Sequence, residues 1–135
     1  MSRTDADNAD PAIRPSLLLV DDDPLICDSL EFVLKERFDV SVHGTRANAV
    51  AALHRASNVP QIALVDLGLP PEPHAPDEGF ALVAELLRIN AQMKVIVLSG
   101  QNERANVHHA MTLGAVDFVA KPCEPPVLMA RLEHQ

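Results

Sequence analysis

Five short apolar runs alternate with helix-like segments along most of the sequence. The runs cover residues 17–20, 40–42, 62–65, 95–98 and 116–119. Apolar residues recur at helical spacing in the segments that follow them, which predicts helices over 24–37, 45–57, 79–90, 102–113 and 124–134. The runs are continuously apolar, as expected when helices cover both faces of a parallel sheet. The pattern predicts an open, doubly wound α/β domain with five parallel strands.

The length of 135 residues suits one such domain. Residues 1–15 are polar and acidic, so we expect a disordered leader there and the folded domain at 16–135. No apolar stretch resembles a signal peptide or reaches the length of a membrane span. We therefore expect a cytoplasmic protein that binds no membrane. Cys27 and Cys123 are expected to be reduced thiols.

Charge and aromatic content bear on nucleic-acid binding. The formal net charge is −8, and the eleven basic residues are scattered along the chain. Phosphate contacts need clustered lysine and arginine, and single-stranded nucleic acid needs aromatic stacking platforms. Aromatic residues make up only 3% of the chain. We expect no nucleic acid to be bound by this domain itself.

One stretch interrupts the alternation. Residues 67–78, with the sequence LGLPPEPHAPDE, contain four prolines and predict an extended loop. A loop of this length calls for a functional or lineage-specific explanation, and the favoured interpretation is a tolerated surface insertion. In the fourth predicted helix, Val107 and Met111 are interpreted as core residues, whereas Arg104, His108 and His109 are expected to face solvent.

Chemically active side chains follow four of the five predicted strands. In strand order they are Asp21, Asp22 and Asp23; Asp66; Ser99 and Gly100; and Lys121 and Pro122. The second strand is followed only by His43 and Gly44, and is expected to be an edge strand away from the site. Ligands of open parallel sheets bind outside the carboxyl ends of the strands. We therefore expect carboxylates, a hydroxyl and an ammonium group to meet in one crevice.

This combination of groups suits phosphoryl transfer. Clustered carboxylates repel one another and are tolerated mainly where a hard divalent cation neutralises them. Such an ion could hold Asp66 and an incoming phosphoryl group together, while Ser99 and Lys121 each bind a phosphoryl oxygen. Asp23, before Pro24, is instead expected to cap the first helix.

Four segments resemble, in order and position, the motifs of response regulator receiver domains. They are VDDDP, VDLGLP, VIVLSG and GAVDFVAKP, within a resemblance that covers about residues 16–134. It implies a flavodoxin-like sheet with strand order 2-1-3-4-5 and a phosphoryl group accepted on Asp66. It also implies Mg²⁺ (or Mn²⁺) at the acidic pair Asp21 and Asp22, with Asp22, Asp66 and the backbone carbonyl of Gly68 as direct ligands.

The same resemblance implies how the domain switches. Ser99 and Lys121 would contact the phosphoryl group, Lys121 would precede a cis-prone Pro122, and Phe118 would be the aromatic switch residue that follows Ser99. Positions 68 and 101, here Gly68 and Gln101, are those that tune phosphoryl lifetime in the family.

The implied partners are a sensor histidine kinase or phosphotransfer protein, and a C-terminal output domain or partner protein that controls transcription. A homodimer through the face formed by the fourth helix, fifth strand and fifth helix is also implied. The wording DLGLPP…EGF resembles the receivers of NtrC-type activators associated with exopolysaccharide and PEP-CTERM systems.

Three functions were compared. The first is a signalling switch, which catalyses only its own phosphoryl transfer and slow autodephosphorylation. The second is an aspartate-nucleophile phosphatase of the haloacid-dehalogenase kind, which resembles DxD at the nucleophile; here the second position is Gly68, so the general acid is missing. The third is a flavin-binding domain, for which no phosphate-cradling loop is found. The switch is the favoured interpretation.

Overall fold

A five-stranded parallel sheet forms the centre of the computed structural model, which describes residues 14–56, 59–71, 75–100, 103–121 and 124–135. The strands are β1 (Ser16–Val20), β2 (Asp39–His43), β3 (Ile62–Asp66), β4 (Lys94–Ser99) and β5 (Asp117–Ala120). They pair in the order β2-β1-β3-β4-β5, and every pair is parallel. The predicted doubly wound sheet and its strand order are confirmed.

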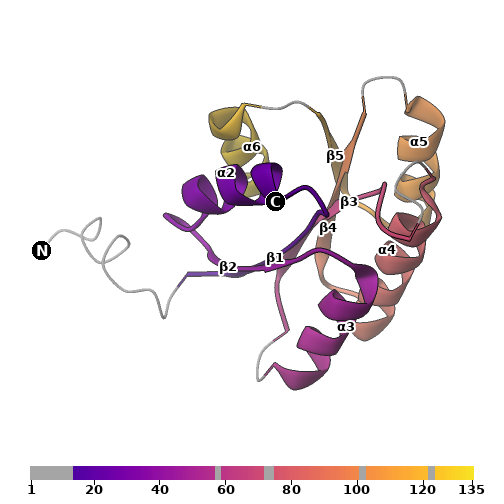
Figure 1. The fold of residues 1–135 in the computed structure, drawn as a ribbon, viewed down its shortest axis with the longest axis horizontal. Coiled ribbons are helices and arrows are strands. Elements are labelled where there is room, and N and C mark those ends of the chain that lie inside the picture. The colour runs from indigo at the N-terminus through magenta and orange to yellow at the C-terminus, as the bar shows by residue number, and fades with distance from the viewer. Residues whose placement is uncertain (1–13, 57–58, 72–74, 101–102, 122–123) are drawn as a thin grey trace, which may run out of the picture.

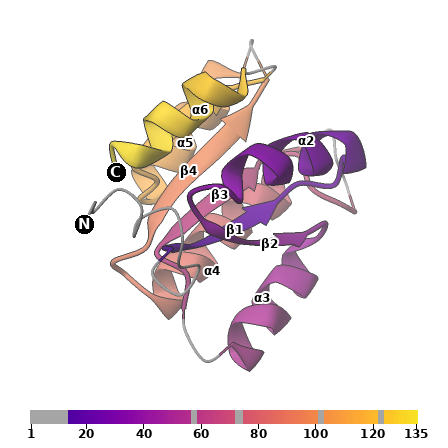
Figure 2. The same cartoon turned by 90° about the vertical axis from the view of Figure 1, so that its left-hand side faces the viewer.

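Helices cover both faces of this sheet. They are α2 (Pro24–Leu34), α3 (Arg46–Arg55), α4 (Asp77–Ile89), α5 (Arg104–Leu113) and α6 (Pro125–Glu133). Figure 1 and Figure 2 show α2 and α6 on one face, with α3, α4 and α5 on the other. Side chains of β1, β3 and β4 alternate between the two faces, because successive residues of a strand point to opposite sides.

Two apolar clusters result from this alternation. One joins the sheet to α3, α4 and α5 and includes Leu18, Val65, Val97, Leu82 and Leu86. The other joins it to α2 and α6 and includes Leu19, Leu64, Leu98, Leu34 and Leu128. The three central strands are apolar except at their ends, because both of their faces are buried, whereas the edge strands β2 and β5 are only partly covered.

The start of α2 follows the prediction. Asp23 is its N-cap, and the Asp23 side chain accepts a hydrogen bond from the backbone N–H of Leu25. Pro24 occupies the first turn, where its missing N–H has no helical partner to lose. The cap leads the chain directly from β1 into α2 and leaves Asp21 and Asp22 at the strand end.

The loop after β3 differs from the prediction. Leu67 and Leu69 are 1% and 0% exposed and belong to the core cluster, so a surface insertion is the wrong description for this part of 67–78. Helix α4 begins at Asp77, two residues earlier than predicted, and residues 72–74 lie outside the described ranges. The first residues of the loop after Asp66 therefore pack in the core, ahead of its prolines.

Helix α5 also differs in its burial. Met111 is 38% exposed, so its interpretation as a core residue is wrong, and Val107 is only partly buried. The helix contacts the core chiefly through Ala110, which is fully buried. Because this contact is small, the side chains on either side of it remain partly or largely exposed. Arg104, His108 and His109 are exposed as expected, although the His109 ring also packs edge-on against Phe80 of α4.

Several predicted features fall on undescribed residues. Among them are residues 1–13 of the expected leader at 1–15, together with Gln101, Pro122 and Cys123. Cys27 is a free, buried thiol. Among the described residues, the helices all lack the length and apolarity needed to cross a membrane.

Candidate functional site

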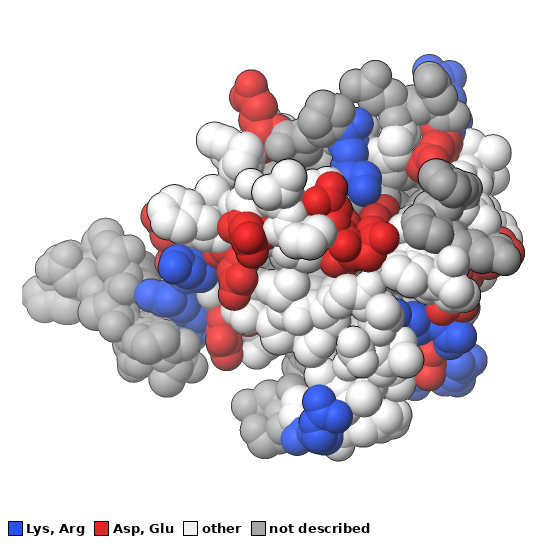
Figure 3. Space-filling view, viewed as in Figure 1, with Lys and Arg blue, Asp and Glu red and all other residues white. Residues whose placement is uncertain are grey.

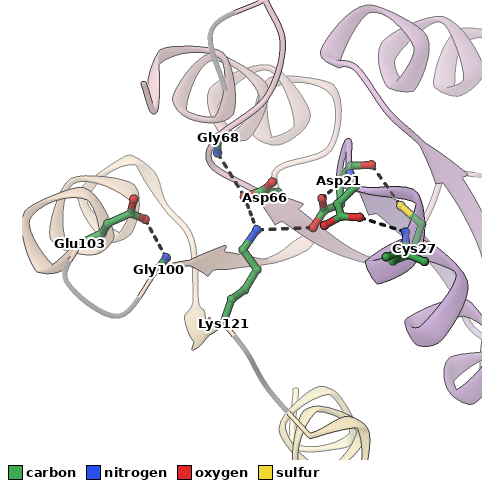
Figure 4. A network of polar contacts seen from close by, with 9 residues as sticks. Asp21, Cys27, Asp66, Gly68, Gly100, Glu103 and Lys121 are labelled. Carbon is green, nitrogen blue, oxygen red and sulfur yellow. Dashed lines mark hydrogen bonds and ion pairs between the residues drawn. The ribbon is translucent and has the colours of Figure 1, made fainter. Parts of the chain in front are cut away.

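The carboxyl ends of β1, β3 and β5 bring Asp21, Asp22, Asp66 and Lys121 together. Figure 4 shows the Lys121 side chain extending between Asp66 and Asp21. One carboxylate oxygen each from Asp21, Asp22 and Asp66 lies within 4.8 Å of the others. The predicted convergence therefore occurs for these four residues.

Asp66 ends β3 and is 5% exposed. Its Oδ1 accepts a hydrogen bond from the backbone N–H of Gly68 at 3.2 Å and lies 3.1 Å from Lys121 Nζ. One contact comes from the turn after β3 and the other from the end of β5, so the position of this carboxylate depends on Gly68 and Lys121, which are 53 residues apart in the sequence. The contacts hold it beside Asp21 and Asp22.

Asp21 is more deeply placed, at 1% exposure. Its Oδ1 accepts the backbone N–H of Asp23 at 2.9 Å. Its Oδ2 is buried without a hydrogen bond in the described part of the chain, and Lys121 Nζ is 3.8 Å away. A buried carboxylate oxygen without a donor is costly, so this atom is suited to a cation or a bound water.

The electrostatics of the cluster follow from burial and like charge. Burial, with the nearby Asp66 carboxylate, raises the pKa of Asp21 to about 6, although the Asp23 N–H and Lys121 oppose the rise. Burial also raises the pKa of Asp66, against the opposing effect of Lys121. Burial alone would lower the pKa of Lys121, but Asp66 and Asp21 outweigh it and raise that pKa. Lys121 therefore stays protonated, but its single positive charge does not neutralise the carboxylates around it.

These features fit a hard divalent cation. Such ions prefer carboxylate, carbonyl and water oxygens, and an ion here would supply the positive charge that Lys121 alone does not. Figure 3 shows acidic atoms gathered near the middle of one face of the molecule, beside basic atoms. The donor set contains only oxygens from Asp21, Asp22 and Asp66, as Mg²⁺ and Mn²⁺ favour.

Ser99 and Phe118 border an adjoining pocket of about 540 Å³ between the end of β4, α5 and β5. Ser99 is 2% exposed, and its hydroxyl donates to the carbonyl of Gly100 at 3.2 Å. Phe118 is 40% exposed. In this structure the Ser99 hydroxyl is turned to its neighbour's carbonyl, and the Phe118 ring has open volume beside it.

Two contacts of the site were not foreseen from the sequence. The Cys27 thiol donates to the backbone carbonyl of Asp21 at 3.1 Å, and burial raises the pKa of that thiol to about 11, so it stays protonated as a donor. The Glu103 carboxylate accepts the backbone N–H of Gly100 at 2.7 Å. Glu103 lies three residues after Gly100, a local spacing that was a usable signal, whereas the contact of Cys27 depends on how α2 packs against β1.

Comparison with known sequences identifies the family. The sequence profile described as "Response regulator receiver domain" matches residues 17–133. The chain belongs to the response regulator receiver family. It is similar to the transcriptional regulatory protein AruR of Pseudomonas aeruginosa, with 32% identity over 127 residues that cover 91% of this chain and 50% of that protein. It is also similar to the DNA-binding response regulator MtrA of Mycolicibacterium smegmatis, with 31% identity over 121 residues, 89% of this chain and 50% of that protein.

Solved receiver structures share the fold. A CheY-like receiver domain protein from Methanospirillum hungatei superimposes with a TM-score of 0.79 at 26% identity, covering 90% of this chain and 92% of that one. NtrX from Brucella abortus gives a TM-score of 0.80 at 24% identity, covering 90% of this chain but 26% of the longer NtrX chain, and this likeness concerns the fold alone. This receiver domain spans about half the length of the curated relatives it matches.

Family membership makes the chain a receiver domain of two-component signalling and a signalling switch in kind. It also favours the switch over the phosphatase and flavin-binding alternatives.

Proposed function

We propose that this receiver accepts a phosphoryl group on Asp66 in a cation-dependent reaction and changes conformation as a result. The observation that supports this most directly is the placement of Asp66 in a cluster in which Lys121 and two further carboxylates converge on it. Asp21, Asp22, Asp66 and the carbonyl of Gly68 would hold Mg²⁺ or Mn²⁺. When bound, the ion neutralises the carboxylates and the incoming phosphoryl oxygens.

The chain's own groups have distinct tasks in this proposal. An Asp66 carboxylate oxygen forms the new bond to phosphorus while the bond from phosphorus to the donor breaks, and the donor keeps that electron pair. The donor is a phosphohistidine of a kinase or phosphotransfer protein, whose imidazole nitrogen is released. Lys121 binds one phosphoryl oxygen, and the Ser99 hydroxyl turns from Gly100 to bind another. Phe118 then moves into the volume beside it.

The wider setting is part of the same proposal. The curated relatives are transcriptional regulators about twice as long as the matched region, which supports an output domain that controls transcription. We place the folded domain at 16–135 after a leader at 1–15, in the cytoplasm, with dimerisation through the α5–β5–α6 face. The link to NtrC-type activators of PEP-CTERM and exopolysaccharide systems rests on the wording after Asp66 alone.

The test uses acetyl phosphate as the donor. With Mg²⁺, wild-type protein should gain one phosphoryl group by intact mass, and hydroxylamine should remove it because an acyl phosphate is formed. EDTA should prevent the gain. Asp66→Asn should gain none, whereas Asp39→Asn, which alters an exposed carboxylate at the start of β2, should behave as wild type.

The opposite results are equally clear. Undiminished labelling of Asp66→Asn would refute the assignment of the acceptor. Sustained, enzyme-like hydrolysis of p-nitrophenyl phosphate by the wild type would favour the phosphatase alternative.

A further inference from the structure

Gly79, in the first turn of α4, lies directly against the backbone of Leu67. A Cβ added at Gly79 would lie 2.6 Å from the Leu67 carbonyl oxygen and 2.8 Å from its carbonyl carbon, and closer still to its Cα. Ordinary contacts of a Cβ are 3.4–4 Å. Any side chain at this position therefore requires α4 and Leu67 to move apart by about 1 Å.

Leu67 cannot move without disturbing the candidate site, because it is the residue between Asp66 and Gly68. Its N–H donates to the Leu98 carbonyl at 3.3 Å, and its side chain is 1% exposed in the core. Its carbonyl accepts the N–H of Leu69 at 3.1 Å. A displacement of the Leu67 backbone would therefore also displace the carboxylate of Asp66 and the carbonyl of Gly68.

Helix α4 cannot easily retreat instead. The Arg46 guanidinium contacts Glu78 at 3.0 Å and Glu85 at 3.1 Å, which ties α4 to the start of α3. Leu82 and Leu86 of the same helix are fully buried. Since α4 is held on its core side and by α3, a side chain at position 79 cannot be accommodated by movement of the helix alone, and part of the displacement falls on the buried turn after β3.

We propose that Gly79 is a positioning residue for the cation site, because its lack of a side chain lets α4 support the Leu67 backbone and so sets the positions of Asp66 and Gly68. This inference rests on the proposed function. It predicts that Gly79→Ala weakens Mg²⁺ binding by roughly 10–100-fold, the range typical for loss of groups that orient metal ligands.

The experiment uses ¹⁵N-glycine labelling, because the chain has only five glycines and Gly68 lies in the site. The Gly68 amide is titrated with Mg²⁺ in wild type, Gly79→Ala and Gly114→Ala. Gly114, at the C-terminal end of α5, is the matched control. Its φ is 119° and an added Cβ would lie 2.6 Å from the Leu87 side chain, so Gly114→Ala is also a strained substitution, but one away from the site. Both variants should melt at lower temperature, and only Gly79→Ala should bind Mg²⁺ more weakly.

Each outcome separates this inference from the proposed function. If wild-type Gly68 does not respond to Mg²⁺, the proposed function fails. If it responds and Gly79→Ala keeps wild-type affinity, or loses no more than Gly114→Ala, Gly79 has only a structural role.

If Gly79→Ala does not fold, the wild-type titration decides the matter. The Gly79 amide should then shift with the same midpoint as Gly68 while Gly114 stays still. A Gly79 amide that is insensitive to Mg²⁺ would overturn the inference.

Discussion

At the scale of single residues, the site is a balance of burial against charge. Asp21 is nearly inaccessible, one of its oxygens accepts no hydrogen bond from the residues that the structure describes, and Lys121 Nζ lies 3.8 Å from that oxygen. Such a group weakens the folded state without a cation and gains most from one. The cost of burying this oxygen without a cation is thus the physical counterpart of the cation binding that we propose.

The pKa of Asp21 gives a testable pH dependence. Burial raises it from 3.8 to about 6, so the folded chain holds this proton more tightly than the unfolded chain. The resulting stabilisation is complete below pH 3.8 and is lost as the pH rises through about 6. In EDTA at neutral pH, Asp21→Asn should therefore be more stable than wild type by an amount on the order of 1–3 kcal/mol. Each unit by which the pKa differs between the folded and unfolded chain corresponds to about 1.4 kcal/mol.

Urea unfolding at several pH values checks this prediction. The advantage of Asp21→Asn should shrink as the pH falls from about 6 toward 3.8. Asp39→Asn reports any general effect of removing one negative charge. A stability advantage of Asp21→Asn that does not change with pH would contradict the prediction.

At the scale of elements, the ends of β3 and β4 differ in how firmly they are held. The turn after β3 is fastened by the burial of Leu67 and Leu69 and by the contact with Gly79. The end of β4 borders a pocket of about 540 Å³, and Ser99 and Phe118 lie beside it. A switching movement therefore has room at β4 and β5 and little room at β3.

This difference predicts where an optical probe will respond. The chain has no tryptophan, so Phe118→Trp introduces a unique fluorophore. Beryllofluoride with Mg²⁺, which mimics the phosphoryl group, should shift its emission to the blue because the ring moves from a 40% exposed position into the pocket.

The control is Phe32→Trp on α2, where the native ring is 67% exposed and remote from the pocket. Its emission should stay unchanged. An unchanged spectrum of Phe118→Trp, with beryllofluoride binding shown by ¹⁹F NMR, would argue against Phe118 as the switch residue.

At the scale of the whole molecule, exposed apolar side chains are found on the α5–β5 side. Met111, Val116 and Phe118 are 38%, 40% and 40% exposed. The neighbouring α6 is tied to β5, because Arg131 forms an ion pair with Asp117 and donates to the Phe118 carbonyl. A movement of Phe118 would therefore alter a surface that includes α5, β5 and α6.

We expect beryllofluoride with Mg²⁺ to promote dimerisation through this surface, as measured by analytical ultracentrifugation. Met111→Glu should weaken the activated dimer by at least about tenfold, or 1.4 kcal/mol, because it places charge in an apolar contact. Leu25→Glu alters an equally apolar but 77% exposed side chain on α2 and should leave the dimer intact. A wild type that stays monomeric when activated would exclude this mode of dimerisation.

The sheet, its helices and the group of residues at the strand ends were predictable from the residue pattern. Central strands that are buried on both faces read as apolar runs. The carboxyl ends of parallel strands lie at the same edge of the sheet, so Asp21, Asp66 and Lys121 could be expected to lie together. The strand order came from the family resemblance. The cap at Asp23 was predictable because it depends on neighbouring residues alone.

Contacts that depend on packing between distant segments could not be predicted from the residue pattern. The burial of Leu69, the exposure of Met111 and the thiol contact of Cys27 depend on helix positions that periodicity does not determine. The approach of Gly79 to Leu67 is the clearest case, because a missing side chain has a role only where another backbone comes close. Local sequence patterns specify helices and strands. The close packing between them depends on the positions of all the helices and strands together.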